Sequence, residues 1–467
     1  MSDSEAREKR SADERPRAVV VGVQLSDVSD GDFESSLREV ERLAKTLGLA
    51  TVGRVTQKRG GLAVGGVVGE GKLEELAGWT GGTGKIPSGA IRKKRKIDAD
   101  EPDEEEIEGD DEDESEGAPR GPVRATIVLV DHDLTPAQVR NLEKATGAEI
   151  LDRTSIILKI FERHARTREA RMQVEIARLT YLAPRLRESG GDRQRGGIGG
   201  KGAGESSSEL DRRRVRDRIA ELKNELVNVE REAEVRRKRC VSPDGGQRTV
   251  ALVGYTNAGK SSWMRLLTSG EVYVADELFA TLDTTVRALA PAVSPRILVS
   301  DTVGFIKKLP HALVASFRST LEEARDAGLL LHVVDAADPA FRAQLDVTRT
   351  VLRELEADDA PSIILLNKMD KIDEETRSAL AEEFPGALFV SAREPESVRR
   401  VHAAIVAFFE KDTREIELFV SYAKQSLVGL IRETVRIVNE SWDNDGLHVT
   451  VRGTSAAIAK IQAELAR

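Results

Sequence analysis

Short apolar runs alternate with amphipathic helical patterns along the chain from residue 17 onward. The run 18–25 (AVVVGVQL) predicts a buried strand, and the segment 33–48 predicts an amphipathic helix that ends at Gly48. The alternation continues through 49–57, 69–78, 125–131, 134–147 and 148–154. Because strands that alternate with helices are typical of parallel sheets, residues 17–162 are predicted to form an α/β domain.

Blocks of like charge interrupt this domain at about residues 79–121. A Gly-rich stretch is followed there by RKKRK (92–96) and by an acidic run (98–116) with fourteen Asp and Glu residues and no base. Such blocks repel internally and bury little, so they predict a disordered insertion, and the polar residues 1–16 predict a disordered tail. The basic block is compatible with a nucleic-acid contact or with a solubilising loop.

Residues 163–240 follow a different pattern, with long charged helices in place of alternating elements. In the second half, apolar residues recur at heptad spacing: Val215, Ile219, Leu222, Leu226, Val229 and Ala233. A Gly-rich connection at 195–209 (RGGIGGKGAGESSSE) joins the two halves and predicts an antiparallel helical hairpin.

This hairpin is the basic part of a chain whose net charge is −9. Residues 163–239 hold 21 Lys and Arg against 13 Asp and Glu, which makes nucleic acid a candidate partner. Arg193, Arg195 and Lys201 are the candidate RNA contacts at the tip of the hairpin. A plain flexible turn is the alternative for the tip.

A second Gly-rich segment follows directly on a predicted strand. The apolar run 249–254 (TVALVG) leads into the pattern G-x-x-x-x-G-K-S, in the strand–loop–helix setting of a phosphate-binding loop. The predicted loop consists of Gly254, Tyr255, Thr256, Asn257, Ala258, Gly259, Lys260, Ser261 and Ser262. Its glycines let backbone N–H groups point at phosphate, Lys260 supplies positive charge to the terminal phosphates, and the Ser261 hydroxyl is a ligand for Mg²⁺. No strand precedes 195–209, so the nucleotide is assigned to this loop alone.

Further predicted strands of a domain at 247–412 also end in polar motifs. RILVSDTVG (296–304) ends in D-x-x-G, which places Asp301 to hold Mg²⁺ through water and the Gly304 N–H to bind the γ-phosphate. LLLHVVD (329–335) is another buried strand. In open α/β sheets ligands bind at the carboxyl ends of the strands, so these motifs are predicted to form one guanine-nucleotide site.

Two more strand ends predict which base is bound. SIILLNKMD (362–370) ends in N-K-x-D, and Asp370 can accept from the ring N–H and the exocyclic amine of guanine, a donor pair that adenine lacks. Asn367 is expected to contact the other edge of the base and the stem of Lys368 to cover it. Ser391 and Ala392, at the end of ALFVSA, complete the predicted GTP pocket.

The segment between the phosphate loop and D-x-x-G carries a resemblance to a known family. ELFATLDTTVRAL (277–289) holds three candidates for the switch threonine that senses Mg²⁺ and γ-phosphate: Thr281, Thr284 and Thr285. Together with the ordered motifs above, it resembles the HflX family of translational GTPases, which carry Phe-Ala-Thr-Leu-Asp at this place, matching Phe279 to Asp283. The resemblance implies Thr281 as the switch residue, with Lys260 and Gly304 as its partners in hydrolysis.

The resemblance covers nearly the whole chain apart from the acidic insertion. Stretches that carry it outside the nucleotide site are 52–59, 69–76, 134–154, 165–186 and 211–219. It implies an N-terminal α/β domain with a helical hairpin, a central GTPase domain and a small C-terminal domain. It also implies binding to the large ribosomal subunit and its rRNA, with GTP-linked splitting or rescue of ribosomes. A ribosome-assembly GTPase and a ribosome-binding module with little hydrolysis remain the alternatives.

The chain departs from the pattern of that family in two places and differs from Ras-like proteins in a third. Trp263 and Arg265 stand in the helix after the phosphate loop, where the family more often has smaller or apolar residues and Asn. The hairpin tip (202–209) lacks the family's Pro and its Thr-Gln-Leu, which alters any specific RNA contact. Phe305 follows D-x-x-G where Ras-like proteins have a water-orienting Gln, so intrinsic hydrolysis is expected to be slow and stimulated by a partner. His311 and Arg318 are alternative catalysts, expected instead on a helix surface.

The remaining features concern the C-terminal segment and the cell compartment. Residues 413–467 predict a small α+β domain that reads strand, helix, strand and a further helix after Thr454. The single cysteine, Cys240, excludes an internal disulfide framework. No apolar stretch approaches eighteen residues and the polar start lacks a signal-peptide core, so a cytoplasmic protein without a membrane span is predicted, as a monomer.

Overall fold

The computed structural model describes residues 15–63, 65–86, 124–185, 207–240, 248–268, 278–279, 285–293, 295–307, 323–357, 359–411 and 413–466. The chain divides into two compact units, residues 1–163 with 177–219, and residues 164–176 with 220–467. Three separate sheets are present in the described part of the chain.

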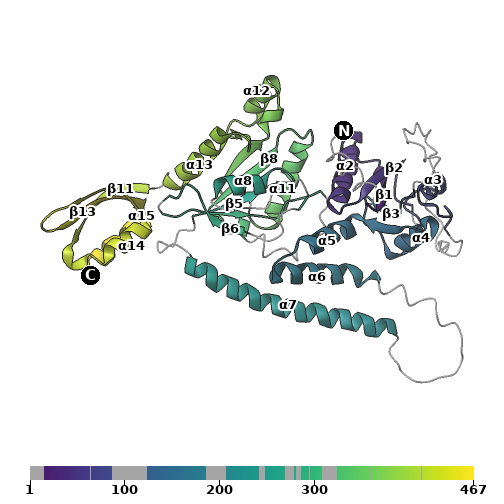
Figure 1. Ribbon diagram of the computed structural model, residues 1–467, viewed down its shortest axis with the longest axis horizontal. Coiled ribbons are helices and arrows are strands. Elements are labelled where there is room, and N and C mark those ends of the chain that lie inside the picture. Colours follow the sequence, from purple (N-terminus) through teal and green to yellow (C-terminus); the bar gives the residue numbers. More distant parts are fainter. Residues whose placement is uncertain are drawn as a thin grey trace, which may run out of the picture. The chain divides into compact units, whose positions relative to one another are not determined.

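The N-terminal sheet is entirely parallel, as predicted for an α/β domain. Its strands lie in the order β2-β1-β3-β4, with β1 (Arg17–Leu25), β2 (Ala50–Arg59), β3 (Ile127–Val130) and β4 (Glu149–Asp152). The helices of this domain, labelled in Figure 1, are α2 (Asp30–Thr46), α3 (Glu70–Thr80), α4 (Pro136–Thr146) and α5 (Arg153–His164). The helix α5 was not predicted, because its sequence begins within a segment that reads as a strand.

Alternating side chains of β1 explain why helices cover both faces of this sheet. Val19, Val21 and Val23 belong to one buried apolar cluster, which also contains residues of α3 and α4. Gly22 faces the other way, and a Cβ there would lie 2.6 Å from a methyl carbon of Leu37 in α2. The absence of a side chain at residue 22 therefore allows α2 to pack closely on β1.

The charged insertion begins later than residue 79, the predicted position. Helix α3 continues to Thr80, and Trp79 is only 5% exposed within the apolar core. A Cβ at Gly53 of β2 would lie 2.5 Å from the Trp79 ring, so the indole fills the space that this glycine leaves. The contact joins positions far apart in sequence, which no local pattern could reveal.

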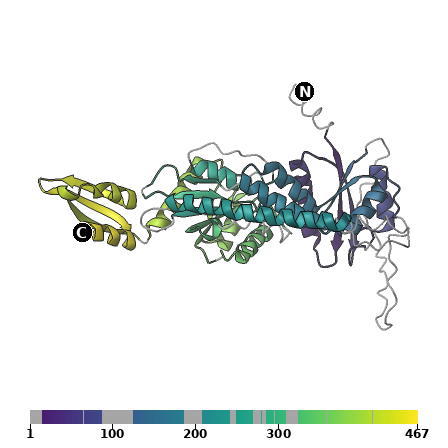
Figure 2. The ribbon, with the colours of Figure 1, turned by 90° about the horizontal axis from the view of Figure 1, so that it is seen from below.

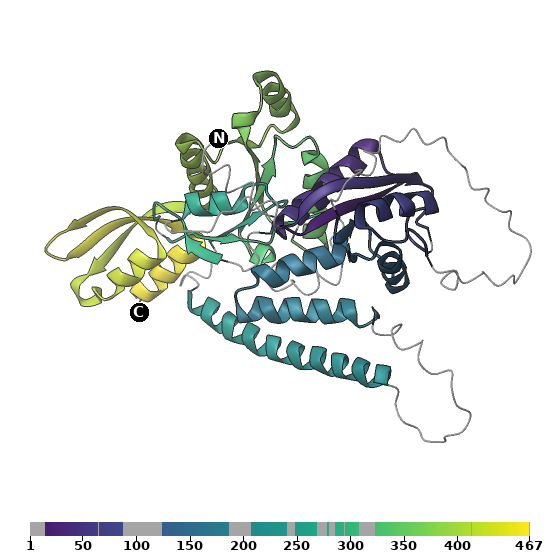
Figure 3. The same ribbon diagram turned by 45° about the vertical axis from the view of Figure 1, so that its right-hand side comes forward.

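Two long helices follow the N-terminal sheet, α6 (Arg168–Leu182) and α7 (Ser207–Cys240). They lie side by side in Figures 1 and 3, and Figure 2 shows α7 as one continuous helix. The predicted heptad seam is only partly buried: Leu222 is 1% exposed, whereas Val215, Ile219, Leu226 and Val229 are half-buried. The side chain of Ala233 and the tip residues Arg193, Arg195 and Lys201 lie outside the described residues.

The central sheet is mixed and mostly parallel, in the order β10-β9-β8-β5-β7-β6. Its strands are β5 (Thr249–Val253), β6 (Thr285–Ala288), β7 (Leu298–Asp301), β8 (Leu329–Asp335), β9 (Ser362–Asn367) and β10 (Leu388–Phe389). Only the β6–β7 pair among them is antiparallel. The described helices of this domain are α8 (Lys260–Leu267), α11 (Phe341–Glu354), α12 (Glu374–Glu383) and α13 (Pro395–Glu410). These elements confirm the predicted α/β class.

The C-terminal sheet is antiparallel, in the order β11-β13-β12. Its elements are β11 (Thr413–Ser421), α14 (Leu427–Thr434), β12 (Arg436–Trp442), β13 (Gly446–Thr454) and α15 (Ser455–Ala466). One predicted strand is in fact a hairpin, because the Asp443 carboxylate accepts from the N–H groups of Asp445 and Gly446 and turns the chain there. In the part of the chain that the structure describes, no helix is both long and apolar enough to cross a membrane.

Candidate nucleotide site

The predicted chemical residues gather at the carboxyl edge of the central sheet. Strand β5 lies between β8 and β7, so the segments that leave these strands meet above its end. Ligands of open α/β sheets bind in the crevice at such a position. The phosphate loop leaves β5, D-x-x-G leaves β7, and N-K-x-D leaves β9.

The phosphate loop adopts backbone conformations that require its glycines. Gly254 has φ of 149° and Gly259 has φ of 104°, both in the region that side chains disfavour. A Cβ at Gly254 would lie 2.2 Å from the Val333 carbonyl oxygen, and one at Gly259 would lie 2.4 Å from Nδ2 of Asn367. The loop is therefore packed tightly between β8 and the N-K-x-D segment.

Lys260 begins helix α8 and folds its side chain back over the loop. Its Nζ donates to the carbonyl oxygens of Gly254 at 3.0 Å and Tyr255 at 2.8 Å. Burial lowers the pKa of Lys260 to about 8, while the negative charge of Asp301 opposes that shift. The ammonium is thus held in a poorly hydrated position, where an anionic phosphate stabilises it strongly.

Ser261 and Asp301 bring two hard oxygen donors together, as predicted for a Mg²⁺ site. The Ser261 hydroxyl donates to Oδ2 of Asp301 at 3.0 Å, and Asp301 is 1% exposed at the end of β7. Hydroxyl and carboxylate oxygens, completed by phosphate and water, suit Mg²⁺. Among the described residues no cluster of three or more His, Cys, Asp or Glu could bind a metal.

The residues after Asp301 lie directly on the phosphate loop. A Cβ at Gly304 would lie 2.8 Å from Cγ2 of Thr256 and 3.0 Å from Nζ of Lys260. Phe305 is 1% exposed, so its side chain is part of the core and cannot orient water. Of the predicted switch residues, Phe279 is buried with φ of 58°, while Thr281 lies outside the described residues, as do Thr284, His311 and Arg318.

Asn367 links the phosphate loop to the Ser391–Ala392 segment. Its Nδ2 donates to the Ala258 carbonyl oxygen at 2.8 Å, and its Oδ1 accepts from the N–H of Ala392 at 3.3 Å. The side chain is 1% exposed. Asn367 therefore braces two loops of the pocket, and its predicted contact with the base stays a prediction.

Lys368 has an acidic partner that the sequence interpretation missed. Its Nζ forms an ion pair with Asp335 at 2.6 Å and also donates to the Asn257 carbonyl oxygen at 2.9 Å. Lys368 has φ of 63°, which turns its side chain toward the phosphate loop. Asp335 ends the strand LLLHVVD at the edge that binds ligands, and that position was the available signal.

Asp370 is held in its ionised form by neighbouring donors, and its predicted contact with the base stays a prediction. The Ser391 hydroxyl donates to its Oδ1 at 2.7 Å, and Arg393 donates to its Oδ2 at 3.3 Å. The pKa of Asp370 is lowered mainly by the Ser391 hydrogen bond, against the opposing effect of burial, with Arg393 adding a smaller favourable charge. The roles of Ser391 as an orienting donor and of Arg393 as a neighbour of Asp370 were not predicted.

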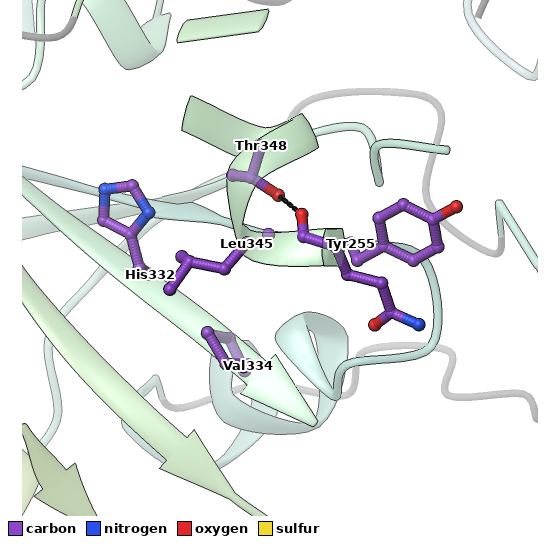
Figure 4. A pocket seen from close by; sticks show the side chains of 8 residues that line it. Tyr255, His332, Val334, Leu345 and Thr348 are labelled. Atoms are coloured by element: carbon purple, nitrogen blue, oxygen red, sulfur yellow. Dashed lines mark hydrogen bonds between the residues drawn. The ribbon is translucent and has the colours of Figure 1, made fainter. Parts of the chain in front are cut away.

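A small cavity lies behind the phosphate loop and is shown in Figure 4. Its volume is about 10 Å³, and its lining includes Gly254, Gln344, Thr348 and His332. Burial lowers the pKa of His332 to about 4, with Arg349 contributing in the same direction, so the imidazole is neutral near pH 7. A space of this size suits at most one water molecule, which excludes it as the nucleotide pocket.

Comparison with known proteins agrees with this geometry. Residues 249–368 match the family model described as 50S ribosome-binding GTPase, residues 164–239 match the middle region of a GTP-binding GTPase, and residues 34–84 and 116–162 match its N-terminal region. A GTPase HflX of Gluconacetobacter diazotrophicus is 54% identical over 97% of this chain and 98% of its own length. The chain belongs to the HflX family of GTPases. It therefore binds guanine nucleotides as a P-loop GTPase.

Other relatives show the same relationship over most of the HflX sequence. A GTPase HflX of Caldanaerobacter subterraneus is 35% identical over 95% of this chain and 92% of its own length. A GTP-binding protein of Sulfolobus solfataricus in complex with GDP is similar at 20% identity, over 83% of this chain and 99% of that one, with a TM-score of 0.42.

Proposed function

We propose that this HflX-family GTPase is a Mg²⁺-dependent switch that binds the large ribosomal subunit when loaded with GTP and splits or rescues stalled ribosomes. The observation that carries the proposal is the meeting of the phosphate-loop, D-x-x-G and N-K-x-D segments at one edge of the central sheet, in a GTPase domain that matches the model described as 50S ribosome-binding GTPase.

Each group at the site has a proposed part in GTP hydrolysis. Lys260 neutralises charge on the terminal phosphates, and the Gly304 N–H donates to the γ-phosphate. The Ser261 hydroxyl, with Thr281 and with Asp301 through water, would hold Mg²⁺, which lowers the barrier by balancing phosphate charge. The 3.0 Å contact between Ser261 and Asp301 supports this donor set.

Burial of Phe305 supports stimulation by a partner. A side chain that is 1% exposed and apolar cannot hold the attacking water for in-line attack. The chain therefore lacks at this position the group that orients water in Ras-like enzymes. A partner that orders the switch or adds a catalytic group can raise hydrolysis by roughly 10³–10⁵.

The helical hairpin is the proposed RNA contact. Arg213, Arg214 and Arg216 of α7 are exposed, and the tip candidates Arg193, Arg195 and Lys201 extend the same basic segment in sequence. Contacts between cations and phosphates release counterions, so ribosome affinity should fall steeply with salt. Replacement of the three tip residues by Ala should weaken binding and reduce the salt slope, whereas an unchanged slope would contradict this role.

The decisive experiment measures GTP turnover with and without large subunits, followed by gradient sedimentation of ribosomes with GTP, GDP or a non-hydrolysable analogue. The expected results are stimulated turnover and appearance of free subunits with GTP and with the analogue, but not with GDP. No stimulation by large subunits would overturn the proposal. Stimulation without free subunits would instead favour a ribosome-assembly GTPase.

A further inference from the structure

The first residues after Gly304 pair with the phosphate loop through their backbone. Phe305 accepts from the Thr256 N–H at 2.8 Å, and its own N–H donates to the Gly254 carbonyl oxygen at 3.2 Å. Phe305 also forms a parallel bridge with Tyr255, in the same direction as the pairing of β5 with β7. The start of the segment that follows β7 is thus attached to the loop that holds the phosphates.

A side-chain hydrogen bond adds a further point of attachment. The backbone N–H of Lys307 donates to the Tyr255 hydroxyl at 2.6 Å. Tyr255 is 7% exposed, and Figure 4 shows its ring directed away from His332 and Thr348. The bond is partly buried, so water competes with it less than with a surface bond and residue 307 is restrained more firmly.

Gly304 directly precedes these attachments at residues 305 and 307. Its position against Thr256 and Lys260 leaves no room for a side chain, since a Cβ would approach both within 3.0 Å. Gly304 therefore already lies beside the Lys260 ammonium, the group assigned to the terminal phosphates.

We propose that Tyr255 is a positioning residue for GTP: its hydroxyl holds residues 304–307 against the phosphate loop so that Gly304 is in place when the γ-phosphate arrives. This inference rests on the proposed role of the Gly304 N–H. Preorganisation reduces the ordering cost of binding, and only a nucleotide with a γ-phosphate uses this part of the site. The hydroxyl therefore favours GTP over GDP, whereas the base contacts serve both equally.

Tyr255→Phe in the full-length chain tests the inference, because it removes the hydroxyl and keeps the ring. Affinities for GDP and for a non-hydrolysable GTP analogue would be measured by calorimetry with Mg²⁺. Loss of this partly buried hydrogen bond is expected to weaken analogue binding by up to roughly tenfold, and to change GDP binding by less than about twofold. A general loss of structure would weaken both affinities alike and leave their ratio unchanged. The ratio of analogue affinity to GDP affinity therefore reports on Tyr255 specifically.

Two further variants define the bond. Tyr422→Phe removes a hydroxyl that donates to the Asp443 carbonyl oxygen at 2.7 Å in the C-terminal domain, and it should leave both affinities unchanged. Lys307→Pro removes the donor in place of the acceptor, so it should reproduce the Tyr255→Phe effect. Since both changes remove one bond, the double variant should lose little more than either single variant.

Equal losses for GDP and analogue, or no loss for either, would overturn the inference. The Gly304→Ala variant separates the inferred role of Tyr255 from the proposed role of Gly304. If Gly304→Ala keeps the preference for the analogue over GDP, the role of Gly304 fails and the inference fails with it. If Gly304→Ala abolishes the preference while Tyr255→Phe keeps it, only the role of Tyr255 is wrong.

Discussion

Burial of Lys260 predicts that nucleotide binding depends on pH and takes up protons. In the protein without nucleotide, burial lowers the pKa of Lys260 to about 8, although Asp301 acts in the opposite direction. Bound phosphates are negative and favour the ammonium form, so the pKa is higher in the complex. Nucleotide affinity should therefore be highest below about pH 8 and should fall as the pH rises through that value.

The size of the effect follows from the fraction of free protein that carries the ammonium. With a pKa of about 8, roughly nine-tenths of the molecules are protonated at about pH 7 and roughly one quarter at about pH 8.5. The affinity for GDP should fall roughly fourfold over this interval. Binding at about pH 8 should take up about half a proton per nucleotide.

Calorimetry of GDP binding in buffers of different ionisation enthalpy measures both quantities. The measurements end at about pH 8.5, so that guanine keeps its own N1 proton throughout the pH range. Lys260→Gln serves as the control, because it removes the titrating group and should bind more weakly with a flat pH profile. Two results would refute the reasoning. One is a wild-type affinity that does not change with pH, with no proton uptake on binding. The other is a Lys260→Gln variant whose affinity falls with pH as steeply as that of the wild type.

The same lysine predicts the opposite trend for stability without nucleotide. Its pKa is about 8 in the folded chain against 10.5 as an ordinary value, so the unfolded state binds more protons between these limits. The free energy of unfolding should rise with pH across that window, by at most about 3 kcal/mol. Urea unfolding at about pH 7.5 and about pH 9.5 tests the sign, and a fall in stability attributable to Lys260 would contradict it.

Three further substitutions test other parts of the chain. Asp370→Asn should weaken GDP binding by roughly 10²-fold or more, because an amide N–H then faces the donors of guanine. Fluorescence titration with GDP measures the affinity. A loss below about fivefold would count against the assignment of Asp370 to the base. Gly254→Ala should lower thermal stability, since the added Cβ would lie 2.2 Å from the Val333 carbonyl oxygen. Gly71→Ala in α3 is the control: its Cβ would meet nothing within 4 Å, so this variant should be slightly more stable. Asp152→Ala should cost about 3–5 kcal/mol of N-terminal domain stability in chemical unfolding, and a cost below about 1 kcal/mol would disprove the importance of this carboxylate. That buried carboxylate accepts from Leu134, Ser155, Tyr181 and Arg185.

Most elements of the fold and the order of the nucleotide motifs follow from the sequence because they are local. A buried parallel strand is a short apolar run, and a phosphate loop needs glycine and lysine at fixed spacing. The five parallel strands of the central sheet and the positions of Lys260, Asp301 and Asp370 at strand ends could thus be predicted.

Features that join distant segments were decided only by the tertiary structure. The ion pair of Lys368 with Asp335 and the bond of Ser391 with Asp370 connect different strand ends, and sequence spacing carries no information about which side chains meet there. Trp79 belongs to the core because Gly53, on another strand, leaves space for its ring. Likewise, the lowered pKa of Lys260 depends on its burial, which results from packing of the whole domain rather than from its motif.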